Sequence, residues 1–282
     1  MSEKTIVTRE DIEAALRRVG LGAGDLALLH SSLSSMGWVE GGAETVIEAF
    51  RAVLDPAQGT LVLPTLVQSD KSRPKGAPDV RFETWDIERS PSNVGRITEV
   101  ARLRPDAIRS DHPTHSVAAI GARAEEITRG HAAADGRPSP WGPAAFGFGS
   151  PWEKLYESDA HYLFLGTTTS CNTIGHFAQA EFMRRLLERA GARRAELEEQ
   201  VAGYNQPGAW PHFGFAVVEK WLQEKGAMRY AQIGDAALRA TRARLNVDTI
   251  LEKMEDAPEA FLREEFLEWL ARAREAARSE AQ

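Results

Sequence analysis

The sequence has a single cysteine, Cys171, among 282 residues, so no disulfide can form within one chain. A chain without disulfides suits the reducing cytoplasm. The first residues lack the apolar core of a signal peptide. No apolar run approaches the roughly 20 residues that a membrane-spanning helix needs. We therefore expect a soluble cytoplasmic protein with no membrane partner.

An excess of basic residues is also absent. Lysine and arginine together number 34 and aspartate and glutamate 41, which gives a formal charge of −7. Because nucleic-acid binding needs a basic surface, no nucleic-acid partner is expected. An acidic cleft would attract a cationic small molecule, although a mild negative charge is equally typical of proteins that are simply soluble.

The chain contains no internal repeat or low-complexity segment, and short apolar runs alternate with amphipathic segments. Four apolar runs are too short for helices and predict buried strands at 26–29, 60–63, 117–120 and 162–165. Helical patterns cover 8–19, 43–54, 92–102, 122–131, 175–190, 215–225 and 258–279. This alternation predicts an α/β layered fold.

The length and the hydrophobic fraction of 43% suit one large domain over residues 1–282. Irregular insertions are expected near 68–90, 132–150 and 195–212. The second of these is rich in glycine, proline and aromatic residues, which indicates an ordered loop over a site.

A glycine motif near the start matches a known signature by coincidence. Residues 17–23 fit the Arg-x-x-Gly-x-Gly/Ala pattern of the common acetyltransferase superfamily. There the motif follows a strand and opens a helix, whose amides hold pyrophosphate. Here it closes a helix and precedes a strand, where glycine ends a helix.

Polar loops leave two of the predicted strands. The loop at 30–35 offers successive hydroxyls and amides that can hold pyrophosphate or pantetheine oxygens, and an ordinary serine-rich turn is the alternative. It is not a nucleophile elbow, because the Gly-x-Ser-x-Gly pattern is absent.

The second loop, 166–173, runs into a helix on which Thr173 is a natural N-cap and His176 follows in the first turn. A helix N-terminus disfavours imidazolium and leaves the ring able to accept a proton. An amine must lose such a proton before it attacks a thioester; a capping or core histidine is the alternative. Cys171 is less suited as a nucleophile, because transfer to an amine needs no covalent intermediate.

Two histidines, His112 and His115, lie beside Asp111, and His131 follows, which raises the question of a metal site. His112 and His115 span a proline and no clear further ligands follow, so no metal is expected. A metal-dependent hydrolase remains a rival class. Arg109 and Ser116 are better interpreted as phosphate and pantetheine contacts.

Taken together, these segments resemble the antibiotic N-acetyltransferase family, which contains the aminoglycoside 3-N-acetyltransferases. The matching blocks occur in family order, at 29–34 with 38–43, 59–65, 90–95 with Glu99 and Arg102, 109–116, 149–155 and 172–176, with a weaker match over 226–261.

The resemblance implies a mixed central sheet flanked by helices, unrelated to the common acetyltransferase superfamily, and acetyl-CoA as co-substrate without a metal. It implies that His176 acts on the acceptor amine, and His30 is hypothesised to touch the reacting centre. The residues expected to line the coenzyme are Ser31, Ser32, Leu33, Ser34, Ser92, Arg109, Ser116 and Val117.

One position departs from the family pattern. Members usually carry glutamate three residues after the catalytic histidine, and this chain has Gln179. Glu181 lies about 500° further around the helix and faces elsewhere, so Glu99 or Asp111 would have to support His176 instead. The residues expected to contact substrate are Gln179, Thr173 and Asp70.

The resemblance therefore implies an acetyl-CoA-dependent N-acetyltransferase, monomeric or homodimeric, that modifies an aminoglycoside at the 3-amino group of 2-deoxystreptamine and confers resistance. The same chemistry on another amine, such as a biosynthetic intermediate, is the nearest alternative. A non-catalytic module that binds CoA or drug is a further one.

Overall fold

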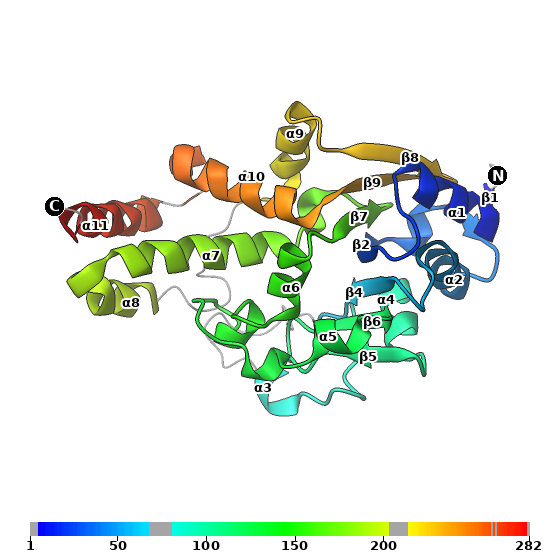
Figure 1. Ribbon diagram of the computed structural model, residues 1–282, viewed down its shortest axis with the longest axis horizontal. Helices are drawn as coiled ribbons and strands as arrows, with labels where there is room; N and C mark the ends of the chain where they lie inside the picture. The colour runs from blue at the N-terminus through cyan, green and yellow to red at the C-terminus, as the bar shows by residue number, and fades with distance from the viewer. Residues whose placement is uncertain (1–4, 68–80, 203–213, 261, 263, 281–282) are drawn as a thin grey trace.

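The computed structural model describes residues 5–67, 81–202, 214–260, 262 and 264–280. A seven-stranded sheet in the order β5-β6-β4-β2-β7-β9-β8 forms its centre (Figure 1). The strands are β2 (Leu26–Ser31), β4 (Thr60–Pro64), β5 (Ala107–Arg109), β6 (Val117–Gly121), β7 (His161–Leu165), β8 (Arg229–Ile233) and β9 (Ala236–Arg242). β2 runs parallel to β4 and β7, and every other neighbouring pair is antiparallel, so the predicted mixed sheet is confirmed. A parallel pair, β1 (Ile6–Val7) and β3 (Trp38–Val39), lies apart from it.

Side chains along the central strands point alternately to the two faces of the sheet, and each face is covered by helices. Leu28, Tyr162 and Phe164 belong to one buried cluster, whereas Leu29 and Leu163 belong to the other. The first cluster packs against α5 (Ala124–Thr128), α6 (Pro151–Glu157), α7 (Ile174–Arg189), α9 (Ala216–Glu224), α10 (Ala243–Asp256) and α11 (Glu264–Glu280). The second packs against α1 (Arg9–Arg18), α2 (Ala43–Leu54) and α4 (Arg96–Arg102). The layered α/β prediction is confirmed.

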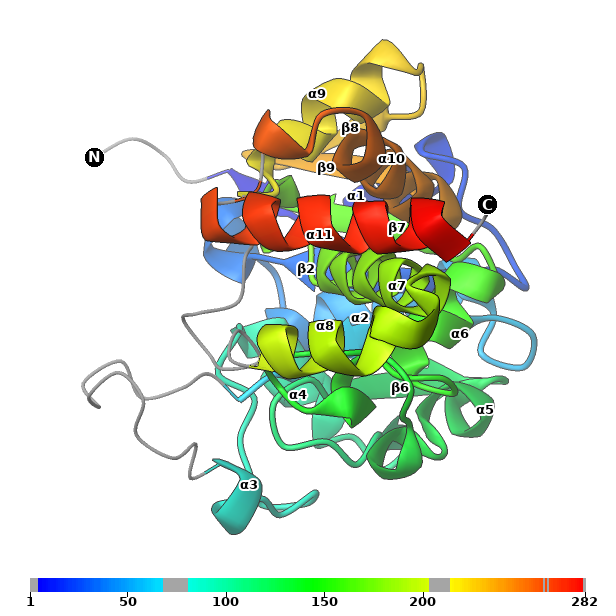
Figure 2. The ribbon, with the colours of Figure 1, turned by 90° about the vertical axis from the view of Figure 1, so that its left-hand side faces the viewer.

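The predicted helices are found with bounds that differ mainly at the ends, whereas α6 and α10 were not predicted. α1 begins after a capping box between Thr8 and Asp11, as the pattern predicts. It ends before Gly20, whose φ of 91° terminates the helix, so the glycine motif there is a helix end. Figure 2 shows α11 running alongside α7, and the two helices are in contact. No helix in the described ranges has the length and apolar character needed to cross a membrane.

The three expected insertions have different outcomes. The segment 132–150 is ordered by two short 3-10 helices, His131–Ala133 and Pro143–Ala145. Part of the first insertion, 68–80, lies outside the described residues, and α3 (Arg81–Thr84) follows it. The expectation of irregular structure at 195–202 is wrong, because these residues belong to α8 (Arg194–Ala202), which buries Leu197 and Val201 one turn apart.

Candidate active site

Parallel strands β2 and β7 end side by side, and this places the two polar loops next to each other. His30 pairs in register with Phe164, and the Ser32 amide donates to the Leu165 carbonyl over 2.9 Å. Gly166 turns the second loop with a φ of 67°. A Cβ at this position would lie 2.9 Å from the Ser35 Cβ and 3.0 Å from the Ser32 carbonyl oxygen, so only glycine fits without movement.

Two cavities open at this edge of the sheet. The large cavity, about 760 Å³, is lined by Ser31, Ser32, Leu33 and Ser34, with Trp38, Val39, Gly41, Gly42, Val94, Gly95, Arg96, Thr167 and Cys171 among its other walls. The small cavity, about 220 Å³, is lined by His30, Ser31, Pro64, Leu66, Val94, Thr98, Thr167, Cys171 and Thr173. Four residues line both, Ser31, Val94, Thr167 and Cys171, so the two cavities adjoin. The predicted donor loop thus lines a groove that leads toward the start of α7.

His176 stands in the first turn of α7, three residues after Thr173 and on the same side of the helix. The ring is half-buried, with centroids 4.7 Å from Trp141 and 4.9 Å from Phe215. Its Nδ1 lies 2.9 Å from the Gln179 Oε1. With the amide oxygen in this position, Nδ1 donates the hydrogen bond, and in this tautomer of the neutral ring Nε2 carries the lone pair.

Gln179 lies in the interior of the protein beside His176. The residue is only 1% exposed, so the expected substrate contact stays a prediction that would need neighbouring side chains to move. Its Nε2 has no hydrogen-bond partner within the described ranges. A neutral amide therefore occupies the place where the family usually has a carboxylate, and it fixes the tautomer without adding charge.

Glu181 faces away from His176, as the helix geometry predicts. Its carboxylate accepts hydrogen bonds from Arg137, Arg184 and Arg185. Burial alone would raise the pKa of Glu181, but the three guanidinium groups lower it to about 2. Arg137 also donates to Glu153 over 2.6 Å, so this buried network clamps the 132–150 segment onto α6 and α7.

Three buried histidines form the wall behind His176. The His115 ring lies 6.4 Å from His176 and 4.6 Å from Trp141, and His112 stacks on His131 at 4.7 Å between centroids. Burial lowers the pKa of His112 to about 4, with the Arg81 charge acting in the same direction. Burial also holds the pKa values of His115 and His131 well below the usual range, so all three rings are neutral at pH 7.

The nitrogens of these rings are engaged by the protein itself. The His112 Nδ1 accepts from the backbone amides of Thr114 and His115. The two nitrogens of His131 lie within hydrogen-bond distance of the Ser110 hydroxyl and the Ala145 carbonyl. The described part of the chain contains no cluster of side chains suited to hold a metal ion. Of the three rings, His115 packs against Trp141, whereas His112 and His131 stack on each other.

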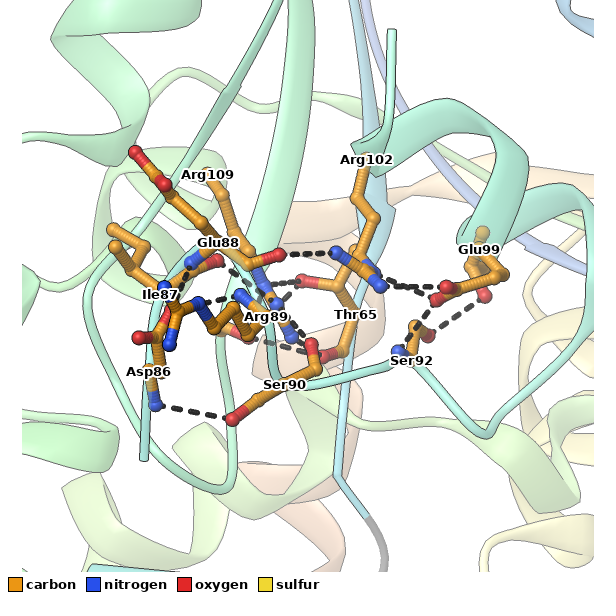
Figure 3. Close-up of polar contacts among 12 residues, drawn as sticks. Thr65, Asp86, Ile87, Glu88, Arg89, Ser90, Ser92, Glu99, Arg102 and Arg109 are labelled. Atoms are coloured by element: carbon orange, nitrogen blue, oxygen red, sulfur yellow. Dashed lines mark hydrogen bonds and ion pairs between the residues drawn. The ribbon is translucent and has the colours of Figure 1, made fainter. Parts of the chain in front are cut away.

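Neither carboxylate that was expected to support His176 contacts it. Glu99 accepts from Arg102 and from the Ser92 amide, and the Asp111 carboxylate accepts from the Trp85 indole over 2.6 Å (Figure 3 shows the Glu99 contacts). These partners hold both carboxylates in other parts of the fold.

Arg109 has a structural environment that its sequence context did not indicate. Its guanidinium donates to the carbonyls of Thr65, Ile87 and Ser90 (Figure 3). The same group lies 4.5 Å from the centroid of the Trp85 ring. Burial and the neighbouring Arg102 charge lower the pKa of Arg109 to about 10. These contacts join the 85–90 segment to β5 and to the end of β4. They engage the guanidinium for which a phosphate contact was expected, and that contact stays a prediction.

The remaining expected coenzyme contacts are also enclosed. Ser116 and Val117 are fully buried, and the Ser116 hydroxyl bonds to Thr65, so neither side chain offers a surface to a coenzyme. Ser92 is buried, and its hydroxyl pairs with Thr98 at 2.9 Å. Asp70 lies outside the described residues.

The sequence did not indicate that Trp141 and Phe215 pack against His176. The aromatic-rich segment 132–150 was expected to cover a site, and Trp141 in it does lie against His176. No local pattern singles out Trp141, because the contact depends on how the segment folds back over α7.

The chain is similar to known proteins of one family. A model of the aminoglycoside 3-N-acetyltransferase family matches residues 28–255. The SPbeta prophage-derived aminoglycoside N(3')-acetyltransferase-like protein YokD of Bacillus subtilis is 35% identical over 61% of this chain and 64% of its own length. Aminoglycoside N(3)-acetyltransferase VII of Streptomyces paromomycinus is 32% identical over 69% of this chain and 66% of its own length.

The chain thus matches slightly less than two thirds of each of these two relatives. Among solved structures, that of the aminoglycoside acetyltransferase AAC(3)-IVa superposes with a TM-score of 0.67 at 25% identity, covering 98% of this chain and all of that one. The resemblance seen in the sequence is confirmed: the chain belongs to the aminoglycoside 3-N-acetyltransferase family.

Proposed function

We propose that this protein transfers the acetyl group of acetyl-CoA to an amino group of an aminoglycoside, with His176 as the general base. The 3-amino group of 2-deoxystreptamine is the acceptor that the family implies. The observation that carries the proposal is the continuous path from the large cavity through the small one to Thr173, one turn before a histidine whose Nδ1 is held by Gln179.

The large cavity suits the donor. Hydroxyls of Ser32 and Ser34 line one side, and the exposed Trp38 and the buried Val39 give it an apolar wall. Hydroxyls and amides can hold pyrophosphate and pantetheine oxygens without lysine, and Arg96 adds one positive charge at the same cavity. The acetyl end of the donor would then lie in the small cavity.

In the proposed reaction, the Nε2 of His176 takes a proton from the acceptor ammonium, and the freed nitrogen pair attacks the thioester carbon. The carbonyl π pair moves onto oxygen as the C–N bond forms. It returns as the C–S bond breaks, and the sulfur leaves with the bonding pair as CoA thiolate. The nitrogen then loses a second proton, which neutralises the CoA thiolate, and the products are a neutral secondary amide and CoA thiol.

The proposed product explains resistance. An aminoglycoside binds RNA phosphates through its positive charges, and acetylation removes one of them. The chain carries a formal charge of −7, which favours a cationic acceptor. We place the activity in the cytoplasm, where acetyl-CoA is available.

Thiol release from acetyl-CoA tests this proposal, measured with aminoglycosides, polyamines and simple aminosugars as acceptors. Turnover confined to aminoglycosides, with the acetyl group found by NMR on the 3-amino nitrogen, is the expected result. Tight acetyl-CoA binding with no turnover on any aminoglycoside would overturn the acceptor assignment.

A different amine is the second candidate. It is favoured by the neutral Gln179 beside His176 and by the aromatic rings of Trp141 and Phe215 that enclose the base. Aromatic walls suit a less polar amine better than a polycation. Turnover on aromatic monoamines that exceeds turnover on every aminoglycoside would establish this alternative.

A further inference from the structure

His30 is the polar side chain at the end of β2 that lines the small cavity. It lies beside Phe164 on the neighbouring strand β7, with ring centroids 5.7 Å apart and planes inclined by only 10°. The Tyr162 ring lies 5.6 Å away at an angle of 58°. Two aromatic rings thus fix the plane of the imidazole.

This aromatic group reaches the start of the helix that carries His176. Burial raises the pKa of Tyr162 and the nearby backbone amides of Ile174 and Thr173 lower it, but the Tyr162 hydroxyl makes no hydrogen bond within the described residues. Thr173 shares the small cavity with His30, and His176 follows it by one turn. His30 and the proposed base therefore lie near the same cavity, His30 on the sheet and His176 on α7.

His30 retains unused hydrogen-bonding capacity. Its Nε2 is buried without a hydrogen-bond partner in the part of the chain that the structure describes, and so is the Ser31 hydroxyl oxygen. Leaving a buried polar group unpaired costs about 1–3 kcal/mol, and such groups are retained where a ligand completes them. Burial lowers the pKa of His30 to about 3, so at neutral pH the ring carries one N–H and one lone pair.

We propose that His30 is a catalytic residue that donates a hydrogen bond from its neutral imidazole to the thioester carbonyl oxygen of the acyl donor. This inference rests on the proposed acetyl transfer. The bond strengthens as the carbonyl π pair moves onto oxygen, and His30 neither gains nor loses a proton in the step. A neutral N–H in a site without water stabilises a developing oxyanion effectively, because its dipole is already oriented.

Isotope-edited infrared spectroscopy of the complex with acetyl-[1-¹³C]CoA, without acceptor, tests the contact directly. We expect the carbonyl stretch of the bound thioester to lie below that of free acetyl-CoA in the wild-type protein. His30→Phe keeps the ring stack on Phe164 and removes the donor, so the shift should disappear. A role in packing alone would leave the carbonyl band unchanged by the substitution.

Kinetics give the second measurement. His30→Phe should lower kcat by about 10²–10³-fold, which is the usual effect of removing one oxyanion donor. The Kd of acetyl-CoA should change by no more than about threefold, because the hydrogen bond strengthens mainly in the transition state. His30→Gln and His30→Asn place an amide near Nε2 and Nδ1 respectively, and one of them should recover part of kcat together with the carbonyl shift. His161→Gln is the matched control. It also replaces a histidine on a central strand, but His161 pairs with Asp25 and lines neither of the two cavities.

The inference is overturned if wild-type protein binds acetyl-CoA and turns over, but His30→Phe retains both the carbonyl shift and kcat. It is also overturned if kcat and donor affinity fall in parallel with no change in the carbonyl band. If calorimetry shows that wild-type protein does not bind acetyl-CoA, the proposed function fails, and this inference fails with it.

Discussion

The buried histidines His112, His115 and His131 predict that the fold is sensitive to acid in a range where most proteins are stable. Their pKa values lie below the ordinary 6.5 because burial disfavours the charged ring. Between pH 7 and pH 5 the unfolded rings take up protons and the folded rings do not. Stability is therefore complete above the unfolded pKa and is lost as the pH falls below it.

The magnitude follows from linkage. An unfolded histidine of pKa 6.5 is almost fully protonated at pH 5, which favours unfolding by about 2 kcal/mol for each ring that stays neutral in the fold. Three rings give about 6 kcal/mol, which is comparable to the whole stability of many domains. Because Trp141 packs on His115, activity should be lost over the same range.

Urea unfolding at a series of pH values measures this effect. In the variant His112→Asn, the amide oxygen can accept from the Thr114 and His115 amides as Nδ1 does, but the side chain does not titrate. Its loss of unfolding free energy between pH 7 and pH 5 should be smaller than that of wild type by about 2 kcal/mol. Equal losses in the two proteins would refute the reasoning.

Three further predictions concern single contacts. Gln179→Glu places a carboxylate beside the His176 Nδ1 and stabilises the imidazolium, so the acid limb of the pH profile of kcat/KM should move to higher pH by about one unit. An acid limb that does not move would mean that the contact between residue 179 and His176 does not act in turnover. Gly166→Ala forces an L residue into a φ of 67° against Ser32, and we expect a loss of about 1–2 kcal/mol in stability together with weaker acetyl-CoA binding by calorimetry. An unchanged Kd for acetyl-CoA would show that the turn at Gly166 does not shape the donor site. Arg137→Met removes a guanidinium partner from the buried carboxylates of Glu153 and Glu181, and the free energy of unfolding measured in urea should fall by about 3–5 kcal/mol. A fall below about 1 kcal/mol, which is typical of a surface ion pair, would show that the network is not needed for stability.

The central strands could be predicted because each is an uninterrupted apolar run buried on both faces. The outer strands β5, β8 and β9 were missed for the opposite reason. β8 is largely exposed at the edge of the sheet, and β9 alternates buried residues with residues such as Arg239, so neither has the composition of a buried strand. α8 was missed because it buries only Leu197 and Val201.

The candidate site was predictable where it depends on the order of elements along the chain. Loops that follow parallel strands meet at one edge of the sheet, and this rule placed Ser31 near Thr173. Roles that depend on distant partners were not predictable. Arg109 and Glu99 looked available as isolated charges, but Thr65, Ser90 and Arg102 engage them once the chain folds.

The most direct test of the account is turnover and donor binding measured on the same preparation of His176→Ala. The account predicts that thiol release with the best aminoglycoside acceptor falls by about 10²–10⁴-fold, as expected for loss of a general base. The Kd of CoA should stay at the wild-type value, since His176 does not line the large cavity. Near-normal turnover in this variant would contradict the assignment of the base and, with it, the proposed mechanism.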